Sequence, residues 1–151
     1  MEQKLYDTVT DCPVIAAIKD DAGLERCLDS DIQIVFVLYG DIVSIPEIVD
    51  RIKKKGKLAM VHADLISGLA GKEIAIDFLK RNTQADGIIS TKLSFIKRAK
   101  ELGMATVFRF FVIDSMAFDN IQKQYEAACP DFVEILPGIM PKIIAKVAKM
   151  V

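Results

Sequence analysis

Charged and polar side chains stand at the ends of several short apolar runs in this sequence of 151 residues. The clearest case is Arg109, which has a phenylalanine on each side, at positions 108 and 110. A guanidinium stays charged at any working pH and a buried charge must be paired, so Arg109 needs a carboxylate or an anionic ligand. The other candidates are His62, Asp64, Ser90, Lys92 and Glu134. Together, side chains of these types could hold a small anion that carries hydroxyl groups.

The same residues permit a structural interpretation, in which Arg109 forms a permanent ion pair with Glu134 or with Asp64. Because side chains alternate along a strand, Ser90 and Lys92 should share a face if their strand extends that far. The sequence leaves the structural and the ligand-binding interpretation open.

Most catalytic motifs are missing from the sequence. His62 is the only histidine, which excludes multi-histidine metal sites, and we expect no metal. A serine hydrolase is unsupported because there is no G-x-S-x-G motif. Lys92 could form a Schiff base in an aldolase-like barrel, although only its position supports this. The three cysteines lie far apart, and we interpret them as small apolar side chains in a reducing cytosol.

Two further features could contact phosphate groups. The loops 66–71 and 136–141, the second of which contains Gly138, precede predicted helices, where they could bind phosphate or form ordinary turns. Lys142, Lys146 and Lys149 recur on one face of the last predicted helix and could contact RNA. The formal net charge of −1 does not indicate a general nucleic-acid binder, so any RNA contact would be local.

Short β-branched runs alternate with amphipathic segments along the chain, which predicts six βα units in a single domain, residues 1–151. The expected strands are 13–18, 33–39, 57–63, 87–90, 104–111 and 132–136, and the later expected helices are 72–81, 93–102, 115–128 and 141–150. Strict alternation implies a parallel sheet, either doubly wound or closed into a barrel. Polar residues at the strand ends, and the lack of a dinucleotide-binding or P-loop motif, favour a TIM-like (β/α) barrel.

The number of units is too small for a closed barrel, which has about eight strands. We therefore expect a C-terminal truncation. If the sheet is instead open, its apolar edges at 13–18 and 132–136 require a partner, which favours a homo-oligomer.

The composition, 52% hydrophobic and 27% charged, excludes an intrinsically disordered chain. The longest apolar run, 34–39, is far shorter than the roughly 18 residues that a membrane helix needs. We expect a soluble intracellular protein with no membrane segment.

Six segments of the chain, in order and at consistent spacing, resemble the glycerol uptake operon antiterminator family. They are residues 13–18, 36–41, 61–69, 86–92, 109–115 and 134–142. The resemblance implies a TIM-like barrel and a cytoplasmic regulator that senses glycerol 3-phosphate and acts on leader mRNA in transcription antitermination. It implies no cofactor and no enzymatic activity. Members of that family continue into a further strand with a Gly-Gly-Leu turn, which this chain lacks.

Combined with the strand-end residues, the resemblance predicts a glycerol 3-phosphate site at the barrel mouth. Arg109 and Lys92 would bind the phosphate, and Asp64 and Glu134 would accept hydrogen bonds from the glycerol hydroxyls. The alternative is an aldolase or isomerase for triose or sugar phosphates, with Lys92 as nucleophile and Asp64 or Glu134 as base. A barrel fold alone does not choose between the two functions.

Overall fold

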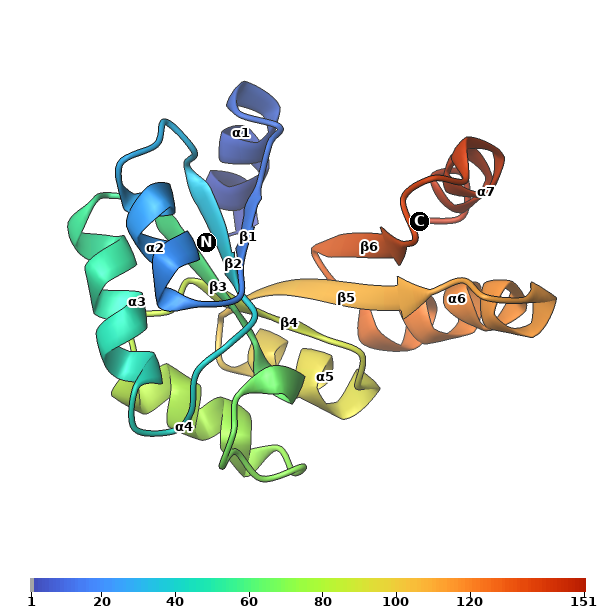
Figure 1. The fold of residues 1–151 in the computed structure, drawn as a ribbon. Coiled ribbons are helices and arrows are strands. Elements are labelled where there is room, and N and C mark those ends of the chain that lie inside the picture. The colour runs from blue at the N-terminus through green and yellow to red at the C-terminus, as the bar shows by residue number, and fades with distance from the viewer. Residues whose placement is uncertain (1) are drawn as a thin grey trace.

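The structure, a computed structural model, describes residues 2–151. Within them, six parallel strands form one sheet in the order β1 to β6, curled into a half-barrel (Figure 1). The strands are β1 (Ala16–Ile18), β2 (Ile34–Val37), β3 (Leu58–His62), β4 (Gly87–Ser90), β5 (Ala105–Phe111) and β6 (Phe132–Leu136). The helices are α1 (Glu2–Asp11), α2 (Asp21–Leu28), α3 (Ile45–Lys54), α4 (Ile74–Asn82), α5 (Leu93–Glu101), α6 (Ser115–Ala128) and α7 (Pro141–Val147), with a short 3₁₀ helix η1 (Ala63–Leu65). The predicted α/β class with barrel-like curvature is confirmed.

Each strand pairs in parallel with the next strand along the chain, so β1 and β6 are the two edges of the sheet. Alternate side chains of the central strands enter two separate apolar cores. Val35, Val61 and Phe108 belong to the larger core, which the outer helices cover, whereas Phe36 and Met60 belong to a smaller core inside the curl. Burial on both faces explains why these strands are apolar throughout.

Helix α1 was missed in the sequence. Leu5 and Val9 lie one turn apart on this helix, and Leu5 is buried in the inner core beside Phe36 and Met60. Two apolar residues in a ten-residue helix give little sequence signal, and an isolated helix of this length is marginal in water. Packing inside the half-barrel is therefore what stabilises α1.

Several predicted boundaries shift in the structure. The strand expected at 13–18 pairs only over Ala16–Ile18, and Pro13 has no N–H to donate to a ladder. The strand expected at 57–63 ends at His62, where the chain turns into η1. The last helix ends at Val147 rather than at residue 150.

The strand does not extend far enough for Ser90 and Lys92 to share a face. Strand β4 ends at Ser90, and Lys92 is the residue that precedes helix α5, so the alternation of a strand does not reach it. Ser90 is fully buried, whereas Lys92 is exposed. The reason is that helix α5 begins immediately after the strand, which leaves only a two-residue connection.

In the part of the chain that the structure describes, no helix is both long and apolar enough to cross a membrane.

Candidate functional site

Arg109, in the C-terminal half of β5, and Glu134, in the middle of β6, form an ion pair. The two residues are direct partners in the register of these strands. Arg109 Nε donates to Glu134 Oε2 at 2.5 Å, and Nη2 donates to Oε1 at 3.2 Å. Of the two partners that the sequence left open for Arg109, the structure therefore selects Glu134. The arginine side chain is only 10% exposed and that of Glu134 is 25% exposed, so solvent weakens this pair less than a surface pair.

Asp64 joins the ends of β3 and β4. Its carboxylate accepts a hydrogen bond from Ser90 Oγ, at 2.9 Å from Oδ1 and 3.1 Å from Oδ2. The backbone N–H and the hydroxyl of Thr91 also donate to Oδ2, at 2.8 and 3.0 Å. The carboxylate therefore fixes the η1 turn against the connection between β4 and α5. Thr91 was not among the residues predicted for the site, although it stands between two of them in the sequence, Ser90 and Lys92.

Lys92 reaches the same carboxylate from the start of α5. Its Nζ lies 3.8 Å from Asp64 Oδ1 and 4.6 Å from the centre of the Phe95 ring. A carboxylate and an aromatic face are both favourable neighbours for a cation. A Cβ atom at Gly71 would lie 3.8 Å from Nζ, so the loop after β3 passes beside this lysine. The lysine side chain is 45% exposed and can contact a ligand.

His62 is buried at the end of β3, and only 3% of its surface is exposed. Its Nδ1 is buried and has no hydrogen-bond partner among the described residues, and it lies 4.0 Å from Asp64 Oδ2. Burial lowers the pKa of His62 and the charge of Arg109 lowers it further, while Asp64 and Glu134 act in the opposite direction. The imidazole is therefore mostly neutral at pH 7.

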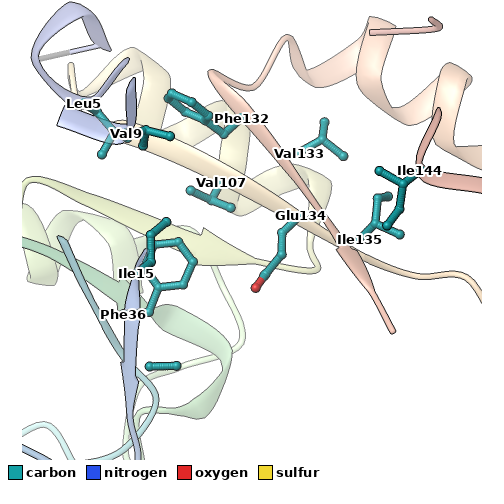
Figure 2. Close-up of a pocket in the computed structure, with 11 residues that line it drawn as sticks. Leu5, Val9, Ile15, Phe36, Val107, Phe132, Val133, Glu134, Ile135 and Ile144 are labelled. Carbon is teal, nitrogen blue, oxygen red and sulfur yellow. The ribbon is translucent and has the colours of Figure 1, made fainter. Parts of the chain in front are cut away.

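A largely apolar cavity of about 430 Å³ opens on the inner side of the half-barrel, between the two edge strands. Figure 2 shows Glu134 extending from β6 toward the centre of this cavity, with apolar side chains around it. The walls come from α1, β1 and the residue before it, β2, β5, β6 and α7, and include Leu5, Ile15 and Phe132. The carboxylate that holds Arg109 therefore also borders the cavity.

Other candidate residues lie away from this cluster. Gly138 is in the loop between β6 and α7, after a cis peptide bond at Leu136–Pro137, and a Cβ atom there would have nothing within 4 Å. Lys142, Lys146 and Lys149 are all exposed, the last of them just beyond the end of α7. The structure therefore brings together His62, Asp64, Ser90 and Lys92. Arg109 and Glu134 lie close to this cluster. Gly138 and the three lysines lie apart from it.

A second cavity, of about 400 Å³, was also missed in the sequence. It lies after β2 and is lined mainly by polar groups, among them Asp21, Tyr39 and Arg51. Burial raises the pKa of Tyr39, and the hydrogen bond from its hydroxyl to Asp21, at 2.8 Å, raises it further. The sequence signal for this cavity was the position of Tyr39, which follows an apolar strand.

No group of three or more histidine, cysteine, aspartate or glutamate side chains within residues 2–151 is arranged to hold a metal ion.

A match to a protein family shows which proteins this chain is related to. The model of the family described as glycerol-3-phosphate responsive antiterminator matches residues 14–151. This chain belongs to that family. The resemblance seen in the sequence is thereby confirmed.

Individual relatives of the antiterminator family agree with this assignment. The chain is 49% identical over 139 residues to an uncharacterized protein, YgcP, of Escherichia coli strain K12, covering 92% of this chain and 73% of that protein. The crystal structure of a glycerol uptake operon antiterminator regulatory protein from Listeria monocytogenes matches with a TM-score of 0.87 and 33% identity, covering 91% of this chain and 74% of that one. A glycerol uptake operon antiterminator-related protein from Thermotoga maritima matches with a TM-score of 0.78 and 36% identity, covering 88% and 76%.

The fold is also similar to that of a 3-dehydroquinate dehydratase from Aquifex aeolicus, with a TM-score of 0.60. The identity is 9%, with 90% of this antiterminator-family chain and 72% of the dehydratase covered, so this likeness concerns the fold alone.

Proposed function

We propose that this protein is a cytoplasmic regulator that binds glycerol 3-phosphate at the C-terminal ends of β3 to β6 and, depending on that ligand, binds leader mRNA. The observation that carries the proposal is Arg109, which lies between two phenylalanines of β5 with only 10% of its side chain exposed, toward the end of the half-barrel where ligands of such folds bind. Membership of a family described as responsive to glycerol 3-phosphate supports the choice of ligand.

Each charged group can have its own role in binding the ligand. Arg109 can present an N–H that Glu134 does not use to a phosphate oxygen, and Lys92 adds a second positive charge. Glu134 and Asp64 are the acceptors for glycerol hydroxyls, since each carboxylate offers about four lone-pair positions. Ser90 is fully buried and donates to Asp64, so its role is to position that carboxylate.

The loop around Gly138 lies at the end of β6 and is our candidate for additional phosphate contacts through its backbone N–H groups. The exposed Lys142, Lys146 and Lys149 are our candidates for RNA contact, because they lie on helix α7, which directly follows this loop, and just beyond its end. A ligand bound at the end of β6 would thus be one loop away from the RNA-binding residues.

Titration of a fluorescently labelled leader RNA of a glycerol uptake operon, with and without glycerol 3-phosphate, tests the proposal. We expect the ligand to change the RNA affinity at least fivefold, and we expect the affinity to fall as salt is added. Replacing Lys142, Lys146 and Lys149 by alanine should weaken RNA binding and reduce its salt dependence. The matched control replaces the exposed Lys80, Lys97 and Lys123. Equal RNA affinity with and without the ligand would overturn the regulatory proposal.

We propose a regulator rather than an enzyme, and turnover assays with triose and sugar phosphates test that part. Turnover that survives purification controls and disappears in Lys92→Ala would replace the regulator by an aldolase-type or isomerase-type enzyme.

A further inference from the structure

Large apolar side chains are exposed on the two connections that follow β5 and β6. They are Phe111 at the end of β5, Ile113 in the connection to α6, Met116 in the first turn of α6, and Ile139 between β6 and α7. Between 53% and 84% of each residue is exposed. Exposed apolar groups that gather in one place mark an interaction site, because monomeric proteins rarely leave large ones in water. We call these four residues the apolar rim.

The two connections that carry the apolar rim start side by side. Phe111 and Leu136, the last residues of β5 and β6, are partners in the register of the two strands. The Val112 N–H donates to the Leu136 carbonyl at 2.8 Å, which holds the two chain segments together just beyond β5. Figure 1 shows both strands ending on the same side of the half-barrel. The residues of the rim therefore leave the sheet at one place.

The segment that follows β6 supplies only positive charge beside the rim. Lys142 lies three positions after Ile139, and Lys146 and Lys149 follow along α7 and just beyond its end. All three lysines are exposed, and residues 137–151 contain no aspartate or glutamate. Apolar side chains beside unopposed cations suit a partner with a negative backbone and apolar faces. A nucleic acid has both.

The apolar rim further selects the unpaired state of such a partner. In an RNA duplex the base faces are stacked on one another, and phosphates, hydroxyls and base edges are what remains accessible. Apolar side chains gain little from such a surface. An unpaired base exposes a flat face, which stacks on an aromatic ring such as that of Phe111.

Two other occupants fit the apolar rim less well. A symmetric dimer would place the same surface of a second copy opposite the rim, and the lysines of the two copies would then repel one another. An anionic membrane would attract the lysines, but Phe111 and Arg109 lie on the side of β5 that carries Val107, a residue of the core inside the curl. A flexible single strand reaches this concave side more readily than a flat lipid surface does.

We propose that the apolar rim binds unpaired bases of the RNA, with Phe111 as the stacking surface, while the three lysines contact the phosphates. This inference rests on the proposed function, because it names the part of the RNA that the regulator recognises. Arg109 and Phe111 are two residues apart on one face of β5, about 6.6 Å along the strand. A base on Phe111 would therefore lie next to a ligand of Arg109, which gives the ligand a direct way to change RNA binding.

Titration of the wild-type chain with two forms of one RNA tests the preference for unpaired bases. The first form is the leader RNA of a glycerol uptake operon, and the second is the same RNA annealed to its complementary strand. With glycerol 3-phosphate present or absent, we expect the annealed form to bind about tenfold more weakly, although it carries more phosphates. Equal or tighter binding of the annealed form would overturn the inference. No binding of either form would instead overturn the proposed function.

Substitutions in the apolar rim assign the effect to its side chains. Phe111→Ala should weaken binding of the leader RNA about tenfold, Phe111→Leu nearly as much because it lacks a ring, and Phe111→Tyr little. Ile113→Ser should also weaken binding. Val43→Ser is its matched control, because Val43 is similarly exposed but follows β2. Wild-type RNA affinity in Phe111→Ala, with glycerol 3-phosphate still changing that affinity, would overturn the inference and leave the proposed function standing.

The same variants decide between RNA and the other two occupants. Co-sedimentation with phosphatidylglycerol vesicles measures membrane binding, and sedimentation velocity without RNA measures self-association. We expect Phe111→Ala and Ile113→Ser to change neither. If both variants lose vesicle binding or self-association while they bind the leader RNA as the wild type does, the apolar rim is a membrane or dimer surface and the inference is wrong.

Discussion

Arg109 and Glu134 occupy opposite positions on two neighbouring parallel strands, and two hydrogen bonds join their side chains across the sheet. The pair lies on the last two strands, so it also ties the edge strand β6 to the rest of the half-barrel. Arg109 thus has a protein partner in this structure, and a phosphate ligand would add to that partner rather than satisfy an unpaired charge.

Glu134→Gln should therefore destabilise the fold. The substitution leaves the guanidinium, which is mostly buried, without a negative partner, and we expect the free energy of unfolding to fall by about 2 kcal/mol. Urea unfolding measures this change. Glu101→Gln is the matched control, because Glu101 pairs with Arg98 on the surface and its loss should matter little. Equal stability of the two variants would show that the Arg109–Glu134 pair contributes nothing to the free energy of unfolding.

Asp64→Asn should also destabilise the protein, because Asp64 holds the ends of β3 and β4 together. The amide keeps one acceptor oxygen, but its NH₂ group faces donors from Ser90 and Thr91. We expect a loss of about 1–3 kcal/mol in the free energy of unfolding. Asp50→Asn, which removes a surface pair with Lys54, serves as the control and should stay close to the wild type. A wild-type unfolding midpoint for Asp64→Asn would refute this role of the carboxylate.

His62 should make stability depend on pH in the range just below neutrality. Its pKa in the folded protein is lowered from 6.5, chiefly by burial and then by Arg109. As the pH falls through 6.5, the unfolded chain takes up a proton before the folded one does, so stability decreases with falling pH and is unaffected above that range. Unfolding experiments between about pH 7.5 and 5.5 measure the slope, which should be smaller in His62→Phe. A histidine that titrates above 6.5 in the folded protein would contradict the burial argument.

Local sequence signals predicted much of the architecture. The helix at Ser115–Ala128 and the strand at Phe132–Leu136 have the predicted bounds, since Asp114 caps the helix start and Pro130 follows its end. Helix α1 was not predictable in the same way, because tertiary contacts of Leu5 stabilise it.

The site was predicted as a set of residues but not as a set of contacts. Which carboxylate pairs with Arg109 depends on the register between β5 and β6, which no local pattern contains. The bond between Ser90 and Asp64 likewise depends on the η1 turn, of which only the first residue, Ala63, was expected to belong to a strand. Both contacts join residues at least 25 positions apart in the chain.

The exposed edges β1 and β6 should cause the 151-residue polypeptide to associate. Sedimentation velocity over a range of concentrations should show oligomers or aggregates. Val14→Lys places a charge next to β1, where Val14 is 62% exposed, and should reduce the association. Val43→Lys is the control, because Val43 is 85% exposed but lies in the loop between β2 and α3. A monodisperse, cooperatively melting monomer would contradict the prediction.

Calorimetric titration of glycerol 3-phosphate into the wild-type chain and into Arg109→Lys tests whether Arg109 binds the phosphate. Lysine keeps the positive charge but loses the planar guanidinium with its several N–H donors. We expect saturable binding to the wild type and an affinity at least tenfold lower in the variant, about 1.4 kcal/mol, with only a modest loss of stability. If the variant loses its stability while its folded fraction binds glycerol 3-phosphate as tightly as the wild type does, Arg109 is purely structural and the site proposed here is wrong.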